Sequence, residues 1–217
     1  MKTYKIFSKI TLLVVLSVCF ISSYNIFAAS NPTVTDAITD EDTQTSSGLV
    51  ITETDGVTTT HFKISNIQNG TLYQIDGTTP ITAGNYITKA QGNAGLRFTP
   101  TLNFNGSGSF DVQASEDDIG TGLSGSVSAT VTVNAVNDAP VITEGDTVPV
   151  PMDEDGTPTA FDLTLHASDA DGDTINWSIS GAAGHGTASV SGSPTGTSQV
   201  ISYTPTSNYN GSDSFIV

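Results

Sequence analysis

The chain has 217 residues, with 22 acidic against six basic side chains and a formal net charge of −16 at pH 7. All 22 acidic residues follow Ser30, where Lys63, Lys89 and Arg97 are the only lysine or arginine residues. This imbalance argues against nucleic acid and anionic membrane surfaces as partners, and it suits a metal cation or simple solubility.

The N-terminal residues have the composition of an export signal. Three lysines precede an apolar run over residues 10–21, and small residues follow at positions 28–30. Such a run is too short to span a bilayer core of about 30 Å, so we expect a cleaved signal peptide over residues 1–29, with an uncleaved anchor as the alternative. The only cysteine, Cys19, lies in this segment, so disulfides cannot stabilise the exported chain. A bulky Val18 before Cys19 disfavours a lipid anchor.

The remainder of the chain shows strand patterns and no sustained helical period. Apolar and polar residues alternate over residues 127–133, 161–165 and 175–179, as they do in half-buried strands. Asn105-Gly106 and Asn210-Gly211 are turn dipeptides that tolerate positive φ. Short strands separated by such turns predict an all-β chain built of sandwiches.

An internal repeat divides the chain into two copies. Residues 98–112 (FTPTLNFNGSGSFDV) and 203–217 (YTPTSNYNGSDSFIV) are identical at ten of 15 positions, and two of the other five exchange Phe for Tyr. Residues 39–42 align with 152–155 in the same way. Agreement at this level predicts two domains of one fold. The first copy is longer around residues 75–91, where we expect an added hairpin, since length changes in loops cost little.

The stretch Asn-Ala-Val-Asn-Asp-Ala-Pro over residues 134–140, here called the seam, separates the copies. Pro140 has no backbone donor and favours an extended conformation at Ala139, so it ends a sheet. We therefore predict domains over residues 31–136 and 137–217. The second copy stops at Val217 without a counterpart of the 127–133 strand, so we expect an incomplete second sandwich with an exposed edge, in a fragment of a longer repeat protein.

Several motifs together resemble the bacterial cadherin-like repeats with a VNDAP signature, which occur in tandem in surface proteins and adhesins. The motifs are the seam, the repeated box, and the segments 152–156 (MDEDG), 167–173 (ASDADGD) and 185–187 (HGT). The resemblance implies tandem Ig-like or cadherin-like Greek-key β-sandwiches, the second incomplete at its C-terminus. It also implies an extracellular or cell-surface location and no catalytic role, and no Gly-x-Ser-x-Gly nucleophile motif is present.

Cadherin-type repeats hold calcium where neighbouring domains join. The resemblance carries this role to Glu41, Asn137, Asp138, Asp169 and Asp171. Carboxylate and amide oxygens are the ligands that calcium prefers, and two carboxylates about 5 Å apart repel by roughly 3 kcal/mol at an effective dielectric near 20. The alternative is that the downstream aspartates form a solvated turn whose side chains cap their own backbone.

Two positions of the seam depart from the cadherin pattern. Ala135 and Ala139 stand where a cadherin linker usually has Asp and Asn. The predicted ligand set is therefore smaller than the one that the resemblance implies.

The function we expect is that of an exported structural or adhesive module, stiffened by calcium at the seam. Its partner would be a surface protein or a glycan, with further repeats in the same polypeptide and no insertion of the mature chain into a membrane. The alternative is a carbohydrate-binding or accessory module of a larger secreted enzyme. In that case Tyr73 and Tyr86 would offer a sugar platform, although tyrosines in a hairpin are more often packing residues.

Overall fold

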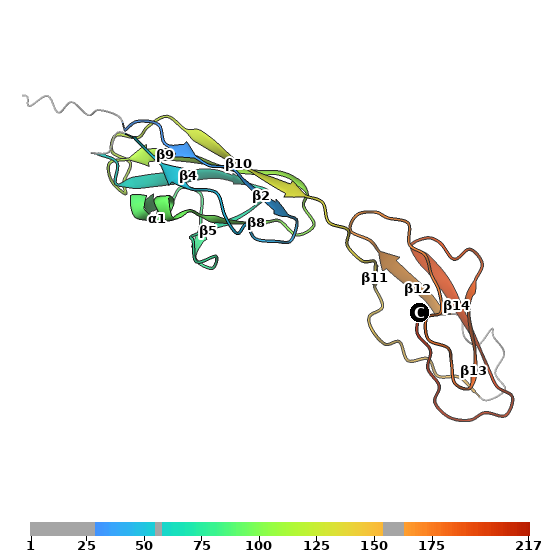
Figure 1. Ribbon diagram of the computed structural model, residues 1–217. Helices are drawn as coiled ribbons and strands as arrows, with labels where there is room; N and C mark the ends of the chain where they lie inside the picture. Colours follow the sequence, from blue (N-terminus) through green and yellow to red (C-terminus); the bar gives the residue numbers. More distant parts are fainter. Residues whose placement is uncertain (1–28, 55–57, 154–162) are drawn as a thin grey trace, which may run out of the picture.

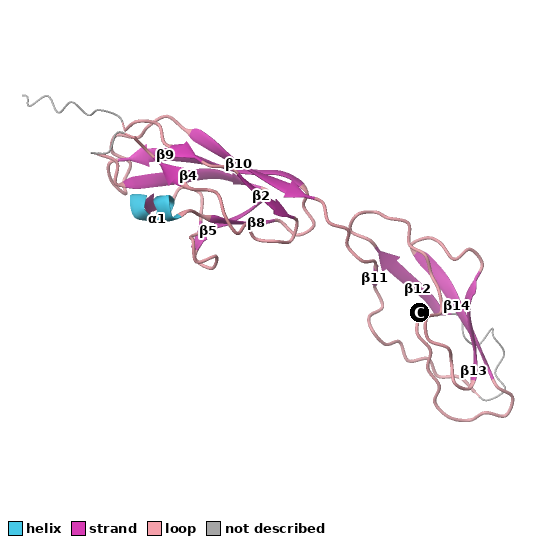
Figure 2. Cartoon of the chain, in the orientation of Figure 1, coloured by secondary structure: helices cyan, strands magenta, loops and turns pink. Residues whose placement is uncertain are grey.

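The computed structural model describes residues 29–54, 58–153 and 163–217. Two strand-rich lobes follow one another along the chain and are joined end to end by the seam (Figure 1). A single short helix accompanies the strands of the described residues (Figure 2). The predicted all-β class is therefore confirmed. The predicted signal peptide lies outside the described residues up to position 28.

The described residues of the first repeat form ten strands of very different length. They are β1 (Thr33–Val34), β2 (Ala37–Asp40), β3 (Ile51–Thr52), β4 (His61–Gln68), β5 (Gly70–Tyr73), β6 (Pro80–Ile81), β7 (Tyr86–Thr88), β8 (Arg97–Pro100), β9 (Gly106–Ser115) and β10 (Val127–Asn134). The strand predicted over residues 127–133 is β10. Its alternate side chains are buried, as the sequence pattern indicates.

The strands of this repeat form a larger and a smaller sheet, with a further β1-β3 pair. The order in the larger sheet is β2-β10-β9-β4-β7, and in the smaller sheet it is β6-β5-β8. β10 pairs antiparallel with β9 through Val127↔Val112 and parallel with β2 through Val131↔Ala37. β10, the last strand of the repeat, therefore lies beside β2 from the beginning of the repeat.

The extra length of the first copy is only partly a hairpin. β5 and β6 do form an antiparallel pair through Leu72↔Ile81. The rest of the extra segment adds β7, which extends the larger sheet, and the helix α1 (Lys89–Ala94). A capping box starts this helix: Thr88 Oγ1 accepts from Gln91 N at 3.2 Å, and Gln91 Oε1 accepts from Thr88 N at 2.7 Å. Six residues are too few to show a helical period, so the sequence pattern missed this element.

One hydrophobic core fills the first repeat. Its completely buried large side chains are Leu49, Ile51, Phe62, Ile64, Leu72, Leu96, Phe98, Phe110, Val112 and Val131. Each burial of this kind contributes about 1.5–3 kcal/mol. Three of these residues, Phe98, Phe110 and Val112, belong to the repeated box, which is therefore a main part of this core.

The described residues of the second repeat form one four-stranded sheet. The order is β11-β12-β14-β13, formed by β11 (Val141–Ile142), β12 (Leu163–Ser168), β14 (Ser198–Pro205) and β13 (Gly186–Ser191). These strands correspond in the repeat to β1, β3, β8 and β5. The expected strand at residues 161–165 is thus present as β12, apart from positions 161 and 162, which lie outside the described residues.

The prediction of a strand over residues 175–179 is wrong, because these residues do not form a hydrogen-bonded ladder. Ile175 and Trp177 are buried and alternate with exposed residues, as the pattern indicates. The segment nevertheless joins its surroundings through one isolated bridge, Asn176↔Thr195, instead of a ladder. Alternation reports which side chains are buried, and a ladder also needs a neighbouring strand in register.

The core of the second repeat is much smaller than that of the first. Its buried members are Leu165, Ala167, Ile175, Trp177 and Ile201. The Trp177 indole N–H donates to the carbonyl of Gly196 at 2.7 Å, which satisfies its only polar group. Several further apolar side chains of this repeat, among them Phe215 and Val217, are only half-buried.

Candidate functional site: the seam between the two repeats

Glu41 connects the first repeat to the seam. It directly follows β2, and its backbone N–H donates to the carbonyl of Asn134 at 2.9 Å, which continues the pairing of β2 with β10. Its carboxylate Oε1 accepts from the backbone N–H of Val136 at 2.7 Å. Glu41 is only 5% exposed, so this contact is shielded from water. The first predicted ligand therefore lies against the seam.

Asp42 and Asn103 extend this acidic corner. Asp42 Oδ1 accepts from the backbone N–H of Asn103 at 2.8 Å. In the orientation that satisfies its neighbours, the Asn103 amide donates to Asp42 Oδ2 at 3.1 Å and to Asp138 Oδ2 at 3.3 Å. Both residues adopt left-handed backbone conformations, with φ of 57° and 54°. Asn103 therefore ties a loop of the first repeat to the seam.

Asp138 connects the seam to the second repeat. Its backbone N–H donates to Asp171 Oδ2 at 2.7 Å. Asp171 lies in the turn that follows β12, so a carboxylate from each repeat accepts a backbone N–H of the seam. This arrangement limits how freely the joint can bend.

The turn after β12 is held by hydrogen bonds between its own residues. Asp169 Oδ1 accepts from the backbone N–H groups of Asp171 and Asp173, both at 3.0 Å. Gly172 supplies the positive φ of 77° that this turn needs. The self-capping that the sequence offered as the alternative to a metal site is therefore present in the structure.

The acidic groups around the seam are close enough to affect one another. The pKa of Asp138 is raised above its ordinary value, first by desolvation and then by repulsion from Asp42, Asp171, Glu41 and Asp169. A raised carboxyl pKa means that the folded protein holds this negative charge at a cost. A bound cation would lower that cost.

Asn137 is the predicted ligand that the structure places apart from these groups. It is exposed, and its amide donates to the carbonyl of its neighbour Asp138 at 2.8 Å. The sequence reasoning missed Asp42 and Asn103. The available signals were the adjacency of Asp42 to Glu41 and the retention of Asn103 in the repeated box, where Asn208 is its counterpart with a similar φ of 60°.

The donor chemistry around the seam suits a hard cation. The carboxylates around the seam present oxygen atoms, the ligands that such a cation prefers, whereas Asn103 turns its amide N–H2 group toward Asp42 and Asp138. In the arrangement seen, each of Glu41, Asp42, Asp169 and Asp171 has one oxygen engaged by a backbone N–H. Within residues 29–54, 58–153 and 163–217, no group of three or more His, Cys, Asp or Glu side chains is arranged to hold a metal ion.

The opposite end of the first repeat has different electrostatics. Glu53 forms an ion pair with Lys89, so its charge is already compensated. Asp117 accepts from the backbone N–H groups of Ile119, Gly120 and Thr121, and bonds led by the Thr121 hydroxyl lower its pKa. These carboxylates therefore stabilise local structure.

Comparison with protein families gives a match over the second repeat. Residues 137–217 match the family model of the bacterial Ig domain. The Ig-like part of the sequence resemblance is thereby confirmed for this repeat, together with the sandwich-type fold. Bacterial Ig domains are typical of extracellular proteins and are not typically enzymes.

Among solved structures, the chain is similar to the extracellular cadherin domains 1–5 of protocadherin gamma B2. The alignment covers 79% of this chain and 32% of that one, at 12% identity and a TM-score of 0.30. No curated protein matches the chain. The described residues contain no helix that is long and apolar enough to cross a membrane.

Proposed function

We propose that the protein is an exported, non-enzymatic surface module in which the seam acts as a semi-rigid joint between two Ig-like domains, stiffened further by calcium. The observation that carries this proposal is that carboxylates of both repeats hold the seam. Glu41 of the first repeat binds Val136, and Asp171 of the second binds Asp138. A passive linker would have no need of such contacts on both sides.

Calcium would be held by carboxylates that lie around the seam, namely Glu41, Asp42, Asp138, Asp169 and Asp171. The ion would supply positive charge to a cluster whose mutual repulsion raises the pKa of Asp138. By offsetting that repulsion it would favour one angle between the domains. The same repulsion without the ion would favour bending at the joint.

Calcium titration of the full chain tests this proposal. We expect saturable binding by calorimetry, a higher melting temperature and a narrower distribution of maximum dimensions in small-angle scattering. Asp138→Asn should weaken calcium binding by roughly tenfold, since it removes one charge from the site. Asp146→Asn, an exposed aspartate of the second repeat outside the seam, is the matched control.

The two parts of the proposal fail separately. If melting and scattering are unchanged up to about 5 mM calcium, above the usual range for extracellular modules, the seam is a metal-free joint. If Glu41→Gln together with Asp171→Asn leaves the distribution of dimensions unchanged without calcium as well, the carboxylates do not restrain the joint at all.

A further inference from the structure

The outer edge of β13 in the second repeat is not paired with any strand of the described residues. β13 is the last strand in the order β11-β12-β14-β13, so it pairs with β14 on one side only. The carbonyl of His185, just before β13, accepts from the backbone N–H of Thr206 at 2.8 Å. Because hydrogen-bonded pairs alternate along an antiparallel ladder, Gly186, Ala188 and Val190 then direct their backbone N–H and C=O groups away from β14. The edge thus presents a row of backbone donors and acceptors.

The same edge is covered in the first repeat. β5 corresponds in the repeat to β13, and β6 pairs antiparallel with it through Leu72↔Ile81 and Tyr73↔Pro80. β6 belongs to the extra length of the first copy, and no strand of the described part of the second repeat takes its place. The fold therefore accepts an antiparallel strand at this edge.

The β13 edge carries none of the features that usually block pairing with another strand. Charged side chains, proline and bulges are the common means by which proteins protect an edge. β13 (GTASVS) contains neither a charged residue nor proline, and its register with β14 runs without a bulge. Val190 is only half-buried against the core, so a strand beside it would also cover apolar surface.

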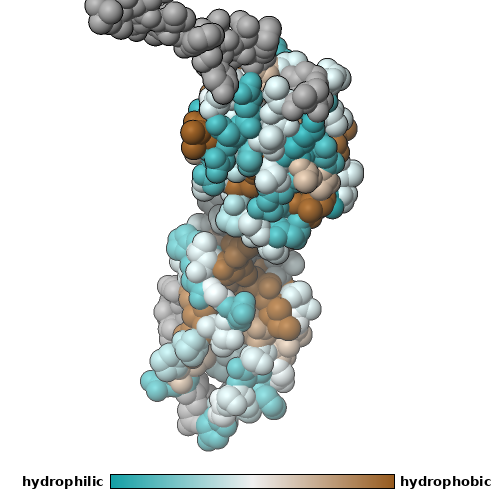
Figure 3. Space-filling model, turned by 90° about the vertical axis from the view of Figure 1, so that its left-hand side faces the viewer, coloured by the Kyte–Doolittle hydropathy of each residue, from teal (hydrophilic) through white to brown (hydrophobic). Residues whose placement is uncertain are grey.

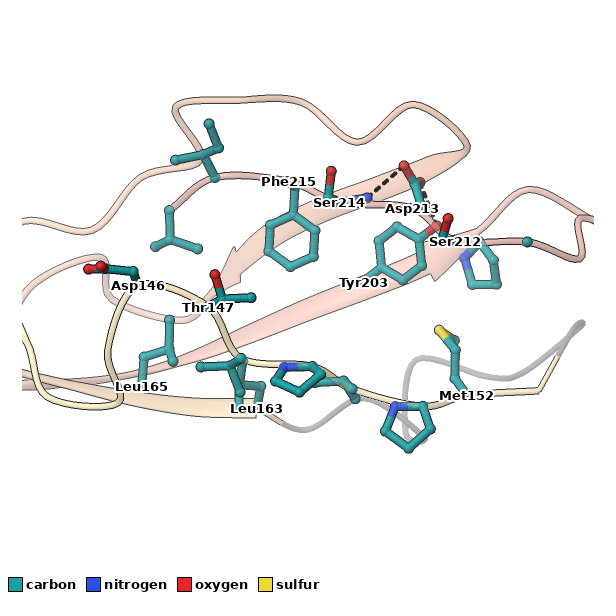
Figure 4. A pocket seen from close by; sticks show the side chains of 18 of the residues that line it. Asp146, Thr147, Met152, Leu163, Leu165, Tyr203, Ser212, Asp213, Ser214 and Phe215 are labelled. Atoms are coloured by element: carbon teal, nitrogen blue, oxygen red, sulfur yellow. Dashed lines mark hydrogen bonds between the residues drawn. The ribbon is translucent and has the colours of Figure 1, made fainter.

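The charge distribution around this edge favours a second copy of the chain as its partner. Residues 174–212 contain no Asp, Glu, Lys or Arg, in a chain whose net charge is −16. Asp213, which follows this stretch, accepts from the hydroxyl of Tyr203 at 2.7 Å and lies beside it in Figure 4. In Figure 3 the visible face of the second repeat carries broad apolar areas, whereas that of the first is mainly hydrophilic. Two copies that repel each other elsewhere can therefore approach along the uncharged strands β13 and β14.

We propose that two copies of the chain pair through their β13 edges, as antiparallel strands related by a twofold axis at Ala188. Ala188 then lies opposite the same residue of the second copy, and Gly186 lies opposite Val190. All three outward-facing residues exchange ladder hydrogen bonds in this register, and their side chains are small or apolar and uncharged. The four-stranded sheets of the two copies become one continuous sheet. This contact is separate from the seam and goes beyond the function proposed above.

Sedimentation velocity on the full chain tests whether the copies associate. A calcium chelator is present throughout, so that calcium at the seam does not contribute to the result. We expect a reversible dimer with a Kd of about 0.1–1 mM, because an edge of six residues buries less surface than the roughly 1,200 Å² of a stable interface. The concentration series therefore extends from about 10 μM to about 2 mM, on both sides of that Kd.

Amide hydrogen exchange tests the register without any substitution. At high protein concentration, exchange should slow by about twofold or more at Gly186, Ala188 and Val190, whose N–H groups point outward. Thr187 and Ser189 alternate with them and lie in the ladder with β14, so their exchange should not depend on protein concentration.

Two variants of β13 locate the contact. Ala188→Pro removes an outward-facing N–H and leaves the ladder with β14 in place, so it should abolish the dimer while the second repeat stays folded. Ser189→Lys places like charges of the two copies on diagonal positions of one face and should weaken the dimer at least about tenfold. Thr132→Lys, at an exposed strand position of the first repeat, adds the same charge and is the matched control. Emission from Trp177, the only tryptophan of the chain, reports whether the second repeat of each variant is folded.

Three results would overturn the proposal. The first is a chain that stays monomeric up to about 2 mM, well above the expected Kd. The second is a dimer that Ala188→Pro and Ser189→Lys both leave intact, which would assign the contact to another surface. The third is slow exchange of the outward-facing amides that does not depend on protein concentration, which would assign the edge to another part of the same chain.

Discussion

At the scale of single residues, the two copies of the repeated box place different side chains next to the same aromatic position. In the first repeat Gly108 lies under the ring of Phe98, where an added Cβ would come within 2.6 Å of Cζ. In the second repeat the matching residues are Asp213 and Tyr203, and they hydrogen-bond at 2.7 Å. The tight glycine–aromatic contact of the first repeat thus has a hydrogen-bonded polar pair in its place in the second.

This polar pair predicts how the second repeat responds to acid. Hydrogen bonds, led by that from the Tyr203 hydroxyl, lower the pKa of Asp213 to about 2, while desolvation first, and then Asp213, raise the pKa of Tyr203 to about 12. A lowered carboxyl pKa stabilises the folded state above the ordinary pKa, near pH 4, and this stabilisation is lost as the pH falls toward 2. The melting temperature of the second repeat, followed by Trp177 emission, should therefore fall as the pH is lowered over that range.

Removing the hydroxyl checks the assignment. Tyr203→Phe should destabilise the second repeat by about 1 kcal/mol at neutral pH, the usual net value of one hydrogen bond, and flatten the pH dependence between 4 and 2. Tyr73→Phe in the first repeat is the control and should change neither. An unaltered acid profile in Tyr203→Phe would show that the pair is not the source.

At the scale of elements, the strands β5 and β13 both start on a glycine pressed against the aromatic ring of the repeated box. A Cβ on Gly70 would lie 2.4 Å from Phe98 Cζ and 2.5 Å from the carbonyl oxygen of Thr99. On Gly186 it would lie 2.4 Å from Tyr203 Cε2. The retained glycine of the Asn-Gly-Thr and His-Gly-Thr segments is therefore required by close packing, since the structure gives neither position a positive φ.

Substitution of this glycine should be costly. We expect Gly70→Ala to destabilise the first repeat by about 1–3 kcal/mol, because the backbone of β8 would have to move. Thr71→Ala, at the exposed next position, should change stability by less than about 0.5 kcal/mol. Chemical denaturation followed by circular dichroism measures both. Similar midpoints for the two variants would contradict the packing argument.

At the scale of the whole molecule, two hydrophobic cores of different size are joined by the seam and by the polar residues that bond to it or across it. The core of the first repeat includes Phe62, Phe98 and Phe110, all completely buried, and that of the second is centred on Trp177 and Ile201. Contacts across the seam are polar and few. The two repeats should therefore unfold as separate units, with the second less stable.

Thermal unfolding can resolve the two units. We expect two calorimetric transitions, of which the lower coincides with the change in Trp177 emission. Phe110→Ala should lower the upper transition, at a cost of about 3–5 kcal/mol, and leave the lower one in place. Leu102→Ala, at a site 76% exposed, is the control. One transition shared by both probes would show that the seam couples the repeats thermodynamically.

The sequence by itself determined the all-β class, the internal repeat and the strands whose alternation is local, such as β10 and β12. These features depend on the period of consecutive side chains, which is visible without any long-range contact. The resemblance to cadherin-like repeats, also read from the sequence, predicted that Glu41, Asp138, Asp169 and Asp171 lie at the seam.

Only the tertiary structure decided which groups meet. Asp42 and Asn103 are 61 positions apart and are joined because two loops fold against each other. The six-residue helix α1 and the missing ladder at residues 175–179 depend likewise on neighbours that no local pattern records.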